Sequence, residues 1–418
     1  MSTMKTTNKL KIGVVGGHRG MSMIRILLDH EDAELVAVCD KEEFMLNRVR
    51  ETAKENNCEL ALFRNFEDFI EYDMDAVVLA NYANEHAVYA IKCLKNGKHV
   101  LSEVLPCETM SQAVELIEAV EETGLVYAYA ENYCYMTHSF EMWKRYKRGE
   151  IGEIQYGEGE YIHDCTGIWP NITYGERHHW RNHMYATFYC THSIGPLLTI
   201  SGLRPVSVVG FETLPNEQFL EMGTYRGAGI EMITLENGAV IKSIHGDLKR
   251  EPHSYSVQVY GKKGMMESAR YNDKEFNIYI EGDEYCKGEW EKYNPENEIG
   301  GELAKKNSGH LGGDFYSTHC FIEKILGRED GQWSIDVYTA VNMGICGILA
   351  WRSVLNGNIP IKIPNLKNKE ERDEFRDDHA CCTPEVAGEQ LLPRCSFPYD
   401  EIPDSTYEHV KDLWLQKR

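Results

Sequence analysis

A glycine-rich turn between two short apolar stretches constrains the fold of this chain more than any other feature. In residues 11–40, KIGVVGGHRGMSMIRILLDHEDAELVAVCD, the first apolar run leads into Gly16, Gly17 and Gly20, then an amphipathic segment, then a second apolar run that ends at Asp40. This order predicts a strand, a tight turn, a helix and a second strand. Glycines in such a turn let the backbone approach a pyrophosphate, whose charge is stabilised by the unpaired N–H groups at the helix start.

The acidic residue at the end of the second strand favours one dinucleotide over the other. Asp40 follows Gly20 by 20 residues, a spacing at which a carboxylate accepts hydrogen bonds from ribose hydroxyls and repels a 2′-phosphate. We therefore predict an NAD site rather than an NADP site. The glycine pattern is irregular, because a G-x-G-x-x-G match would place His18 at the second glycine. An ordinary glycine turn in an α/β domain is the alternative interpretation of these residues alone.

The first third of the chain alternates apolar runs with amphipathic helices. The runs are 75–80, 99–102 and 125–130, and the helices are 41–57, 85–96 and 109–123. Repeated strand-helix units of this length predict a parallel sheet with helices on both faces. We therefore expect a Rossmann domain over residues 1–135.

Beyond residue 135 the pattern changes to period-two alternation. Such stretches occur at 155–163, 205–211, 229–235, 239–245, 254–261 and 276–281. Strands without intervening helices predict a large, mainly antiparallel open sheet. We therefore expect a C-terminal α+β domain over residues 136–418, with further helices at 138–148, 314–326 and 335–355. Residues 284–309 are expected to form a loop, and residues 364–418 are not assigned.

Composition narrows the classes of partner. A chain of 418 residues is long enough for two cores. Its net charge of −22 argues against nucleic acid or an anionic membrane as a partner, because such surfaces require clustered Lys and Arg. The first residues, MSTMKTTNKLK, lack the apolar core of a signal peptide, and no uninterrupted apolar run of 18 residues occurs. We expect a cytoplasmic protein that acts on a small molecule.

Cysteine and histidine spacing predicts neither disulfides nor a metal. The 13 cysteines are scattered without a framework and fit reduced thiols. The tightest cluster, His379, Cys381 and Cys382, lacks a C-x-x-C pair. A second group, which includes the adjacent His178 and His179, has no Cys or carboxylate at ligand spacing.

Polar side chains follow three successive predicted strands. Asn81 and Asn84 follow the first, Glu103 the second, and Glu131 and Asn132 the third. The carboxyl ends of parallel strands form the edge where open α/β sheets bind ligands, so we expect these residues to line a binding crevice. Capping of the next helix is an alternative role for Asn84.

These features resemble the Gfo/Idh/MocA oxidoreductases, which act on sugars with NAD or NADP. The resemblance rests on the glycine turn, Asp40, the run 90–103 (AIKCLKNGKHVLSE) and the two-domain layout, and it covers nearly the whole chain. Typical dehydrogenases of that family have Glu-Lys-Pro, and their lysine helps to handle the proton of the oxidised hydroxyl. This chain has Glu103-Val104-Leu105 instead, which argues against a plain reversible dehydrogenase.

One branch of the family is more similar, the NAD-dependent glycosidases of the α-N-acetylgalactosaminidase type (glycoside hydrolase family 109). They share Glu-Val at this position and a Glu-Asn-x-Cys-Tyr stretch that residues 131–135 match. Tyr189 and His192 match their Tyr-x-x-His. By position, the resemblance implies contacts to NAD from His18, Arg19, Asp40, His86, Glu103 and Asn132. It implies a sugar pocket lined by Tyr161, Arg181, Tyr189, His192 and Tyr338. With the strand-end residues added, the predicted cofactor site is Gly16, Gly17, His18, Arg19, Gly20, Asp40, Asn81, Asn84, His86, Glu103, Val104 and Asn132.

The implied reaction is hydrolysis through transient oxidation. Oxidation of the sugar C3 hydroxyl acidifies the C2 proton, and its removal expels the group at C1; water then adds and C3 is reduced again. Tightly bound NAD is thereby recycled. Tyrosine and histidine suit these proton transfers. We predict that His192 and Tyr189 perform them, and that His163 and Tyr161 place the sugar or assist the leaving group.

Other interpretations of these residues stay open. Tyr161 and His163 share one face of a predicted strand and could form a solvated sheet face, and His192 could be structural. Asp314 could cap a helix or bind the sugar. A sugar, cyclitol or glycoside 3-dehydrogenase and a non-catalytic NAD-binding homologue are the alternative functions. An open antiparallel sheet also suggests a homo-oligomer formed through that sheet.

Overall fold

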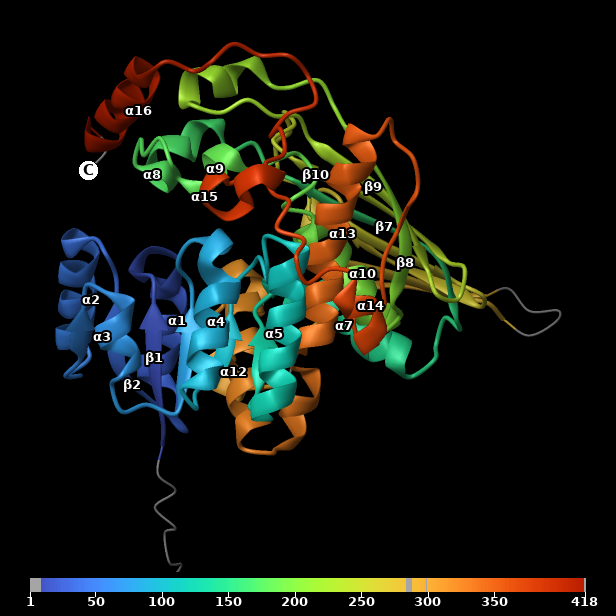
Figure 1. The fold of residues 1–418 in the computed structure, drawn as a ribbon. Coiled ribbons are helices and arrows are strands. Elements are labelled where there is room, and N and C mark those ends of the chain that lie inside the picture. Colours follow the sequence, from blue (N-terminus) through green and yellow to red (C-terminus); the bar gives the residue numbers. More distant parts are fainter. Residues whose placement is uncertain (1–8, 283–287, 298, 417–418) are drawn as a thin grey trace, which may run out of the picture. The chain divides into compact units, whose positions relative to one another are not determined.

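The computed structural model describes residues 9–282, 288–297 and 299–416 (Figure 1). The chain divides into two compact units. The first contains the residues up to 107, residues 112–136 and residues 297–340, and the second contains residues 108–111, 137–296 and 341–418. Apart from residues 108–111, the N-terminal part of the first unit ends at residue 136, next to the expected boundary. The return of residues 297–340 to this unit was not expected from the sequence.

The first unit is built on a six-stranded parallel sheet. Its strand order is β3-β2-β1-β4-β5-β6, with every neighbouring pair parallel. The strands are β1 Leu10–Val15, β2 Ala33–Cys39, β3 Ala61–Phe63, β4 Ala76–Leu79, β5 His99–Ser102 and β6 Tyr127–Tyr129. This is the doubly wound Rossmann order, in which a ligand binds where the order reverses, beside β1 and β4. The predicted fold class of this part is confirmed.

Each strand is followed by one or two helical segments. They are α1 Gly17–Asp29, α2 Glu43–Glu55, α3 Phe66–Ile70, η1 Ala83–Glu85, α4 His86–Lys95, α5 Met110–Thr123 and α6 Asn132–Tyr135. The returning segment adds α11 Gly301–Lys306, η4 Gly309–Gly312, α12 Gly313–Ile325 and η5 Glu329–Trp333. Phe321 and Ile322 of α12 are fully buried in the same hydrophobic core as Ile12, Val14 and Ile24. Burial of these apolar side chains explains why α12 belongs to this unit.

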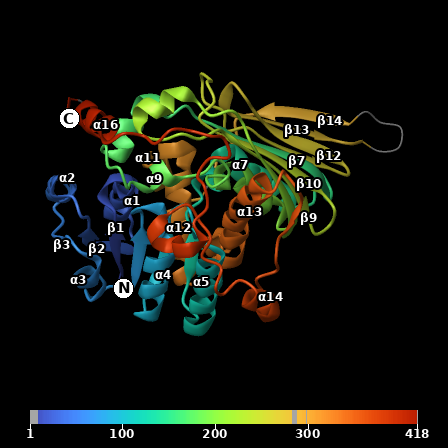
Figure 2. The same cartoon turned by 45° about the horizontal axis from the view of Figure 1, so that its top comes forward.

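The second unit contains a nine-stranded sheet of order β14-β13-β12-β11-β7-β10-β9-β8-β15. Its strands are β7 Ile154–Ile162, β8 Pro205–Glu212, β9 Gly229–Leu235, β10 Val240–Gly246, β11 Val257–Gly261, β12 Gly264–Ala269, β13 Asn272–Ile280, β14 Glu289–Tyr293 and β15 Ile361–Lys362. Neighbouring strands are antiparallel except β7 and β10, which are parallel. Figure 2 shows β12, β13 and β14 at one end of this sheet. The expected mainly antiparallel sheet is confirmed.

The helices of the second unit include two that pack together near β7. These are α7 Thr137–Lys147 and α10 Thr191–Ser201. The others are η2 Thr166–Ile168, α8 Trp169–Thr173, α9 Trp180–His183, η3 Glu217–Met222, α14 Lys369–Asp373, α15 Pro384–Ala387, η6 Gly388–Gln390 and α16 Asp404–Gln416. The helix α13, Val337–Leu355, begins in the first unit and continues in the second. Glycines in β7 let α10 approach its backbone closely, because a Cβ on Gly159 would lie 1.8 Å from the carbonyl oxygen of Ser193.

Two segments differ from the sequence-based expectations. Residues 284–309 were expected to form a loop, but they contain β14 and α11; residues 284–287 and 298 lie outside the described residues. β14 is an edge strand with mostly exposed side chains, Glu-Trp-Glu-Lys-Tyr, so it lacks the alternation of a half-buried strand. The unassigned residues 364–418 contain α14, α15 and α16, and α16 contacts α8 and η3.

One helical segment, Glu329–Leu355, is long and apolar enough to cross a membrane, although no uninterrupted apolar run was found in the sequence. Of the most apolar 18 residues in this segment, 67% are buried within the protein, as expected of a core helix. Among the residues that the structure describes, the cysteines form no disulfide.

Candidate active site

The glycine turn after β1 is held by close backbone contacts. Gly16 adopts a φ of +90°, and a Cβ on it would lie 2.4 Å from the carbonyl oxygen of Ala80. Another residue type at this position would be both strained and obstructed. The N–H of Gly17 donates to Asp40 Oδ2 at 2.6 Å, and the N–H of Glu42 donates to Oδ1 at 2.8 Å. Asp40 is therefore anchored beside the turn, directly after β2.

Burial raises the pKa of Asp40 above its ordinary value, and the two backbone N–H groups act in the opposite direction by stabilising the carboxylate. The carboxylate is thus oriented and partly desolvated before any nucleotide arrives.

The end of β4 carries two buried amide oxygens without partners. Among the described residues, no group is hydrogen-bonded to Asn81 Oδ1 or Asn84 Oδ1, and the Asn81 amide nitrogen donates to Glu85 at 2.9 Å. Buried polar atoms in this state are costly unless a ligand or water satisfies them. Together with the anchored Asp40 and the tight turn at Gly16, they fit a dinucleotide at the reversal point of the sheet.

Arg19 connects two buried carboxylates. Its Nη2 lies 2.6 Å from Glu103 Oε1 and 2.6 Å from Asp314 Oδ1. Burial raises the pKa of Glu103 to about 7, although Arg19 acts to lower it. Burial also acts to raise the pKa of Asp314, but the hydrogen bond from His310 and the charge of Arg19 outweigh it and hold that pKa well below its ordinary value. Glu103 is therefore the carboxyl that exchanges a proton near neutral pH.

Asp314 accepts from three different elements. Besides Arg19, its partners are Asn132 Nδ2 at 3.0 Å and His310 Nδ1 at 2.8 Å. The hydrogen bond to Asp314 raises the pKa of His310. The N-cap of α12 is Gly312, so the interpretation of Asp314 as an N-cap is wrong. Its side chain instead organises the Arg19 and Asn132 side chains, both predicted to contact the cofactor.

The remaining residues predicted to contact the cofactor lie at the same end of this sheet. Gly20 is buried in α1, and His18 is exposed there. Val104 and His86 are buried, and His86 Nδ1 lies 3.1 Å from the carbonyl oxygen of Leu105. Burial lowers the pKa of His86 to about 4, so its ring is neutral near pH 7.

The second unit brings together four tyrosine and histidine side chains predicted from the sequence. The His192 ring lies 4.7 Å from the Tyr161 ring and 4.9 Å from the Tyr189 ring, measured between centroids. The Tyr161 hydroxyl lies 3.1 Å from His163 Nδ1. We call Tyr161, His163, Tyr189 and His192 the tyrosine-histidine cluster.

This cluster forms because β7 and α10 pack together. Gly157, Gly159 and Tyr161 alternate along β7 toward one face, and a Cβ on either glycine would contact α10. His192 lies in the first turn of α10 and Tyr189 just before it, beside the end of β7. The spacing in β7 therefore places Tyr161 next to the start of this helix.

Burial sets the proton affinity of two members of the cluster. Burial, with a further contribution from His253, lowers the pKa of His163 to about 4. Burial also raises the pKa of Tyr161 well above its ordinary value. Near pH 7, His163 is therefore a neutral imidazole that can accept a hydrogen bond, and Tyr161 is a protonated phenol that can donate one.

Two further residues predicted for the sugar pocket have different surroundings. The Arg181 guanidinium, at the start of α9, lies 5.1 Å from the centroid of Tyr189 and 4.5 Å from that of Trp180, so it adjoins the cluster. Tyr338 lies in the first unit and donates to Glu121 Oε1 at 2.6 Å. Glu121 is in the last turn of α5, before β6, and therefore at the edge opposite the glycine turn. The predicted role of Tyr338 in the sugar pocket stays a prediction.

Two aromatic neighbours of the cluster were not predicted from the sequence. The His253 ring lies 4.0 Å from that of His163, and the Tyr255 ring lies 6.1 Å from that of Tyr161 at an angle of 22°. Both precede β11, where a bridge between Ile162 and Ser254 fixes them beside the end of β7. The predicted strand 254–261 contained Tyr255, but pairing of this segment with β7 could not be predicted from either stretch alone.

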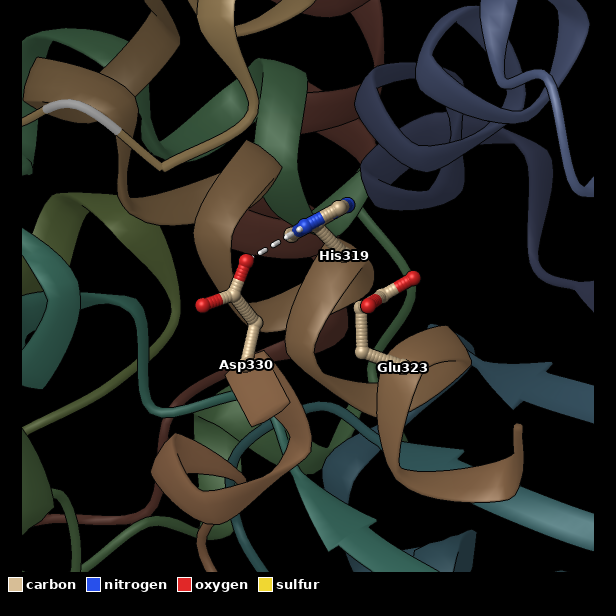
Figure 3. A group of neighbouring side chains, drawn as sticks. All are labelled: His319, Glu323 and Asp330. Atoms are coloured by element: carbon tan, nitrogen blue, oxygen red, sulfur yellow. Dashed lines mark hydrogen bonds and ion pairs between the residues drawn. The ribbon is translucent and has the colours of Figure 1, made fainter. Parts of the chain in front are cut away.

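One group of side chains in the described residues has the spacing of metal ligands, namely His319, Glu323 and Asp330 (Figure 3). Their ligand atoms lie within 4.8 Å of one another. However, Arg328 pairs with Glu323 at 2.9 Å, and His30 Nε2 lies 3.1 Å from His319 Nδ1. A cation at this position would compete with a guanidinium for Glu323, so the contacts better describe a polar network that ties α12 to η5 and α1.

Comparison with known proteins finds family matches for two parts of the chain. Residues 10–131 match a profile described as the oxidoreductase family, NAD-binding Rossmann fold (GFO_IDH_MocA), and residues 224–370 match one described as glycosyl hydrolase 109, C-terminal domain. The chain combines a Gfo/Idh/MocA Rossmann domain with a glycosyl hydrolase 109 C-terminal domain. Both are domains of enzymes, and the first binds NAD. The family resemblance stated from sequence motifs is thereby confirmed.

Whole-chain relatives carry the same family name. A glycosyl hydrolase family 109 protein from Solibacter usitatus is 27% identical over 405 residues, which cover 87% of this chain and 90% of the relative. Another, from Phocaeicola vulgatus, is 24% identical over 404 residues, which cover 86% of this chain and 85% of the relative. The chain is thus a distant homologue of the glycosyl hydrolase 109 proteins.

Solved structures share the fold at low identity. Scyllo-inositol dehydrogenase from Lactobacillus casei, solved with bound NAD(H) and scyllo-inositol, aligns with a TM-score of 0.65 and 17% identity over 86% of this chain and all of its own. Levoglucosan dehydrogenase, solved with NADH and L-sorbose, gives a TM-score of 0.67 and 15% identity over 85% of this chain and 99% of its own. At these identities the likeness supports the two-domain fold alone.

Proposed function

We propose that this chain is an NAD-dependent glycoside hydrolase that oxidises the sugar at C3 transiently and releases the aglycone by elimination. The observation that carries the proposal is the tyrosine-histidine cluster, in which two tyrosines contact His192 beside Arg181. Such groups can hold and move protons at neighbouring sugar carbons without a pair of catalytic carboxylates. The relatives named as glycosyl hydrolase family 109 proteins support the same assignment.

The first unit supplies the cofactor site. Bound NAD would accept a hydride from C3 reversibly. The ketone that oxidation leaves at C3 makes the proton on the neighbouring C2 acidic. Asp40 would accept hydrogen bonds from the adenosine ribose, and Asn81 and Asn84 would satisfy their buried oxygens on the ligand. Glu103, whose pKa is about 7, can hold a proton in this site. The NAD is proposed to stay bound and to be recycled.

The second unit supplies the proton transfers. We assign Tyr189 and His192 to the C3 hydroxyl and the C2 carbon, where one proton leaves during oxidation and a second during elimination. The C1–O bond then breaks and the aglycone departs with a proton. Water would add across the C1=C2 bond, and return of a hydride to C3 and of a proton to its oxygen would restore the hydroxyl. The net change is hydrolysis. Tyr161 and the neutral His163 would orient the sugar by hydrogen bonds.

The lysine used by typical dehydrogenases of the family is replaced by Val104, which is buried. This replacement favours net hydrolysis over net oxidation at C3.

Aglycone release without added NAD tests the proposal. We expect purified protein to release p-nitrophenol from a panel of glycosides, starting with α-N-acetylgalactosaminides, with no net gain in the absorbance of reduced nicotinamide. In D₂O the sugar product should carry deuterium at C2. Accumulation of reduced nicotinamide and a keto sugar would instead show a 3-dehydrogenase. Bound NAD with neither product nor deuterium exchange would show a non-catalytic homologue.

We also propose that the protein is cytoplasmic and forms a homo-oligomer through the C-terminal sheet. Several aromatic side chains of this sheet are exposed, including Phe211, Tyr260, Tyr279 and Trp290. Tyr279 and Trp290 are cross-strand partners on β13 and β14, and neighbouring exposed aromatic groups favour association. Light scattering on the purified protein tests this expectation, and a monomer at all concentrations would contradict it.

A further inference from the structure

A carboxylate that the proposed mechanism does not use is buried beneath the start of α10. Glu231 of β9 is fully buried; its Oε2 accepts from Ser243 Oγ at 2.6 Å, and its Oε1 lies 2.9 Å from His245 Nε2. Among the residues that the structure describes, His245 is the one basic side chain within ion-pair distance of this carboxylate. Apolar side chains of similar size often fill such a position without loss of stability, so stability alone does not account for a carboxylate here.

Ser243 connects this carboxylate to α10. A hydroxyl group has one proton to donate, and Ser243 donates it to Glu231, so the Ser243 oxygen is left as an acceptor. Ser193 Oγ lies 2.8 Å from that oxygen. Ser193 belongs to the first turn of α10 and directly follows His192. A hydrogen-bonded chain therefore runs from the buried carboxylate through two hydroxyl groups to the residue beside His192.

The start of α10 has no side-chain cap, which gives this attachment its importance. Its N-cap is Cys190, which makes no side-chain capping hydrogen bond, and an uncapped helix start leaves backbone N–H groups to find other partners. Ser193 holds the first turn instead. Its Oγ also lies 2.8 Å from the Cys190 carbonyl oxygen. Its own carbonyl oxygen passes over Gly159, the register partner of Ser243, where a Cβ would lie 1.8 Å away.

Strand register places the other partner of Glu231 beside Tyr161. In the parallel pair of β7 and β10, Tyr161 is opposite His245. Opposite residues of paired strands project to the same face of a sheet, so His245 shares the face of Tyr161. The carboxylate of Glu231 therefore contacts one neighbour of Tyr161 directly and reaches one neighbour of His192 through the two serines.

We infer that Glu231 is a positioning residue that fixes His192 within the tyrosine-histidine cluster, acting through Ser243 and Ser193. The inference rests on the hydrolase function proposed above, in which His192 takes up the proton from C2. A reacting group misplaced by ~1 Å can lose about a hundredfold in rate, so a small tilt of the first turn of α10 is enough to slow this step. Buried hydrogen-bond networks make a core more rigid and favour one arrangement. The chain from Glu231 thereby selects the helix position that presents His192 to the sugar.

Removal of single links tests the chain. Ser243→Ala and Ser193→Ala each delete one hydroxyl group with little change in volume, and each should lower kcat about tenfold. Glu231→Leu removes the acceptor itself and should give a loss of the same size. The Ser243→Ala, Ser193→Ala double variant should lose no more than about twofold beyond either single variant, because both substitutions break the same chain. A wild-type kcat in these variants, or single losses that multiply in the double variant, would overturn the inference.

An isotope effect separates misplacement of His192 from partial unfolding. A displaced His192 slows proton removal selectively, so the deuterium isotope effect on kcat for a glycoside labelled at C2 should be larger in both serine variants than in the wild type. Unfolding of a fraction of the molecules lowers kcat and leaves this ratio unchanged, and that result would contradict a positioning role. Ser201→Ala is the matched control on α10, since Ser201 bonds only Leu198 and Leu203 near the other end of the helix. It should change neither quantity.

The NMR signal of the His192 ring gives a readout that does not require turnover. In protein with isotope-labelled histidine Cε1, the His192 signal is identified by its loss in His192→Ala. It should shift in Ser243→Ala and in Ser193→Ala and stay in place in Ser201→Ala. An unshifted signal in both serine variants would overturn the positioning role and leave the hydrolase function standing. Shifted signals in a protein that cleaves no glycoside would overturn the hydrolase function and support the positioning of His192 by this chain.

Discussion

The Nη2 atom of Arg19 lies 2.6 Å from Glu103 Oε1, which joins the glycine-turn helix α1 to the end of β5. The same guanidinium also reaches Asp314. Two buried carboxylates thus share one cation, and they differ in their other donors: His310 and Asn132 bond Asp314. Asp314 consequently stays charged, while burial raises the pKa of Glu103 to about 7. Of these two carboxyl groups, Glu103 is therefore the one whose pKa lies near neutrality.

The first prediction concerns pH and Glu103. Its folded pKa of about 7 exceeds its ordinary value of 4.5, so between these pH values the native state binds more protons than the unfolded state. The contribution of Glu103 to stability is therefore present at low pH and is lost as pH rises toward 7. Glu103→Gln removes this dependence. We expect the difference in Tm, variant minus wild type, to increase from pH 4.5 to 8.

Thermal unfolding followed by tryptophan fluorescence measures this difference. Glu122→Gln, at an exposed position of α5, is the control and should give a curve parallel to the wild type. A Glu103→Gln curve that is also parallel would show that the carboxyl does not titrate in this range.

The second prediction concerns cofactor choice at Asp40. Asp40→Ala removes the carboxylate that accepts from the Gly17 N–H and from the proposed ribose. We expect NAD affinity to fall about tenfold, which corresponds to ~1.4 kcal/mol, and the preference over NADP to narrow. Asp40→Asn keeps an acceptor but removes the charge, so it should retain more NAD affinity while still admitting NADP. Titrations followed by fluorescence measure both constants, and an unchanged preference in both variants would contradict the assignment.

The third prediction concerns the proton-transfer residues. His192→Ala and Tyr189→Phe should each lower turnover by at least about a hundredfold, as expected for loss of a general acid-base group. NAD content should stay at the wild-type level, since neither residue belongs to the first unit. His178→Ala, at an exposed position before α9, should leave turnover unchanged. Near-normal turnover in both cluster variants would remove them from the mechanism.

The fourth prediction concerns the packing that builds the cluster. In Gly159→Ala the new methyl group would lie 1.8 Å from the Ser193 carbonyl oxygen, so α10 must shift. We expect a loss of about 3 kcal/mol in unfolding free energy, together with reduced turnover because His192 moves with the helix. Gly167→Ala is the matched control, since a Cβ there meets nothing within 4 Å. Calorimetry measures both, and equal Tm values would show that β7 and α10 tolerate the methyl group.

Local sequence patterns predicted most elements of both units. The glycine turn, Asp40 and the strand-end residues Asn81 and Glu103 could be placed because each depends on a few neighbouring residues. Alternation along β7 also predicted that Tyr161 and His163 share a face. The exposed edge strand β14 could not be recognised in this way, because alternation requires one buried face.

The sequence by itself predicted a Rossmann domain over residues 1–135 with a carboxylate at the proposed dinucleotide site, because strand, turn and helix signals are short-range. Only the tertiary structure decided which distant segments join these elements. It brought Asp314 of the returning segment to Arg19 and Asn132, because burial of Phe321 and Ile322 holds α12 in the first core. It also set His253 against His163 by pairing Ser254 with Ile162. Contacts of this kind depend on the packing of surfaces far apart in the chain, which no local pattern encodes.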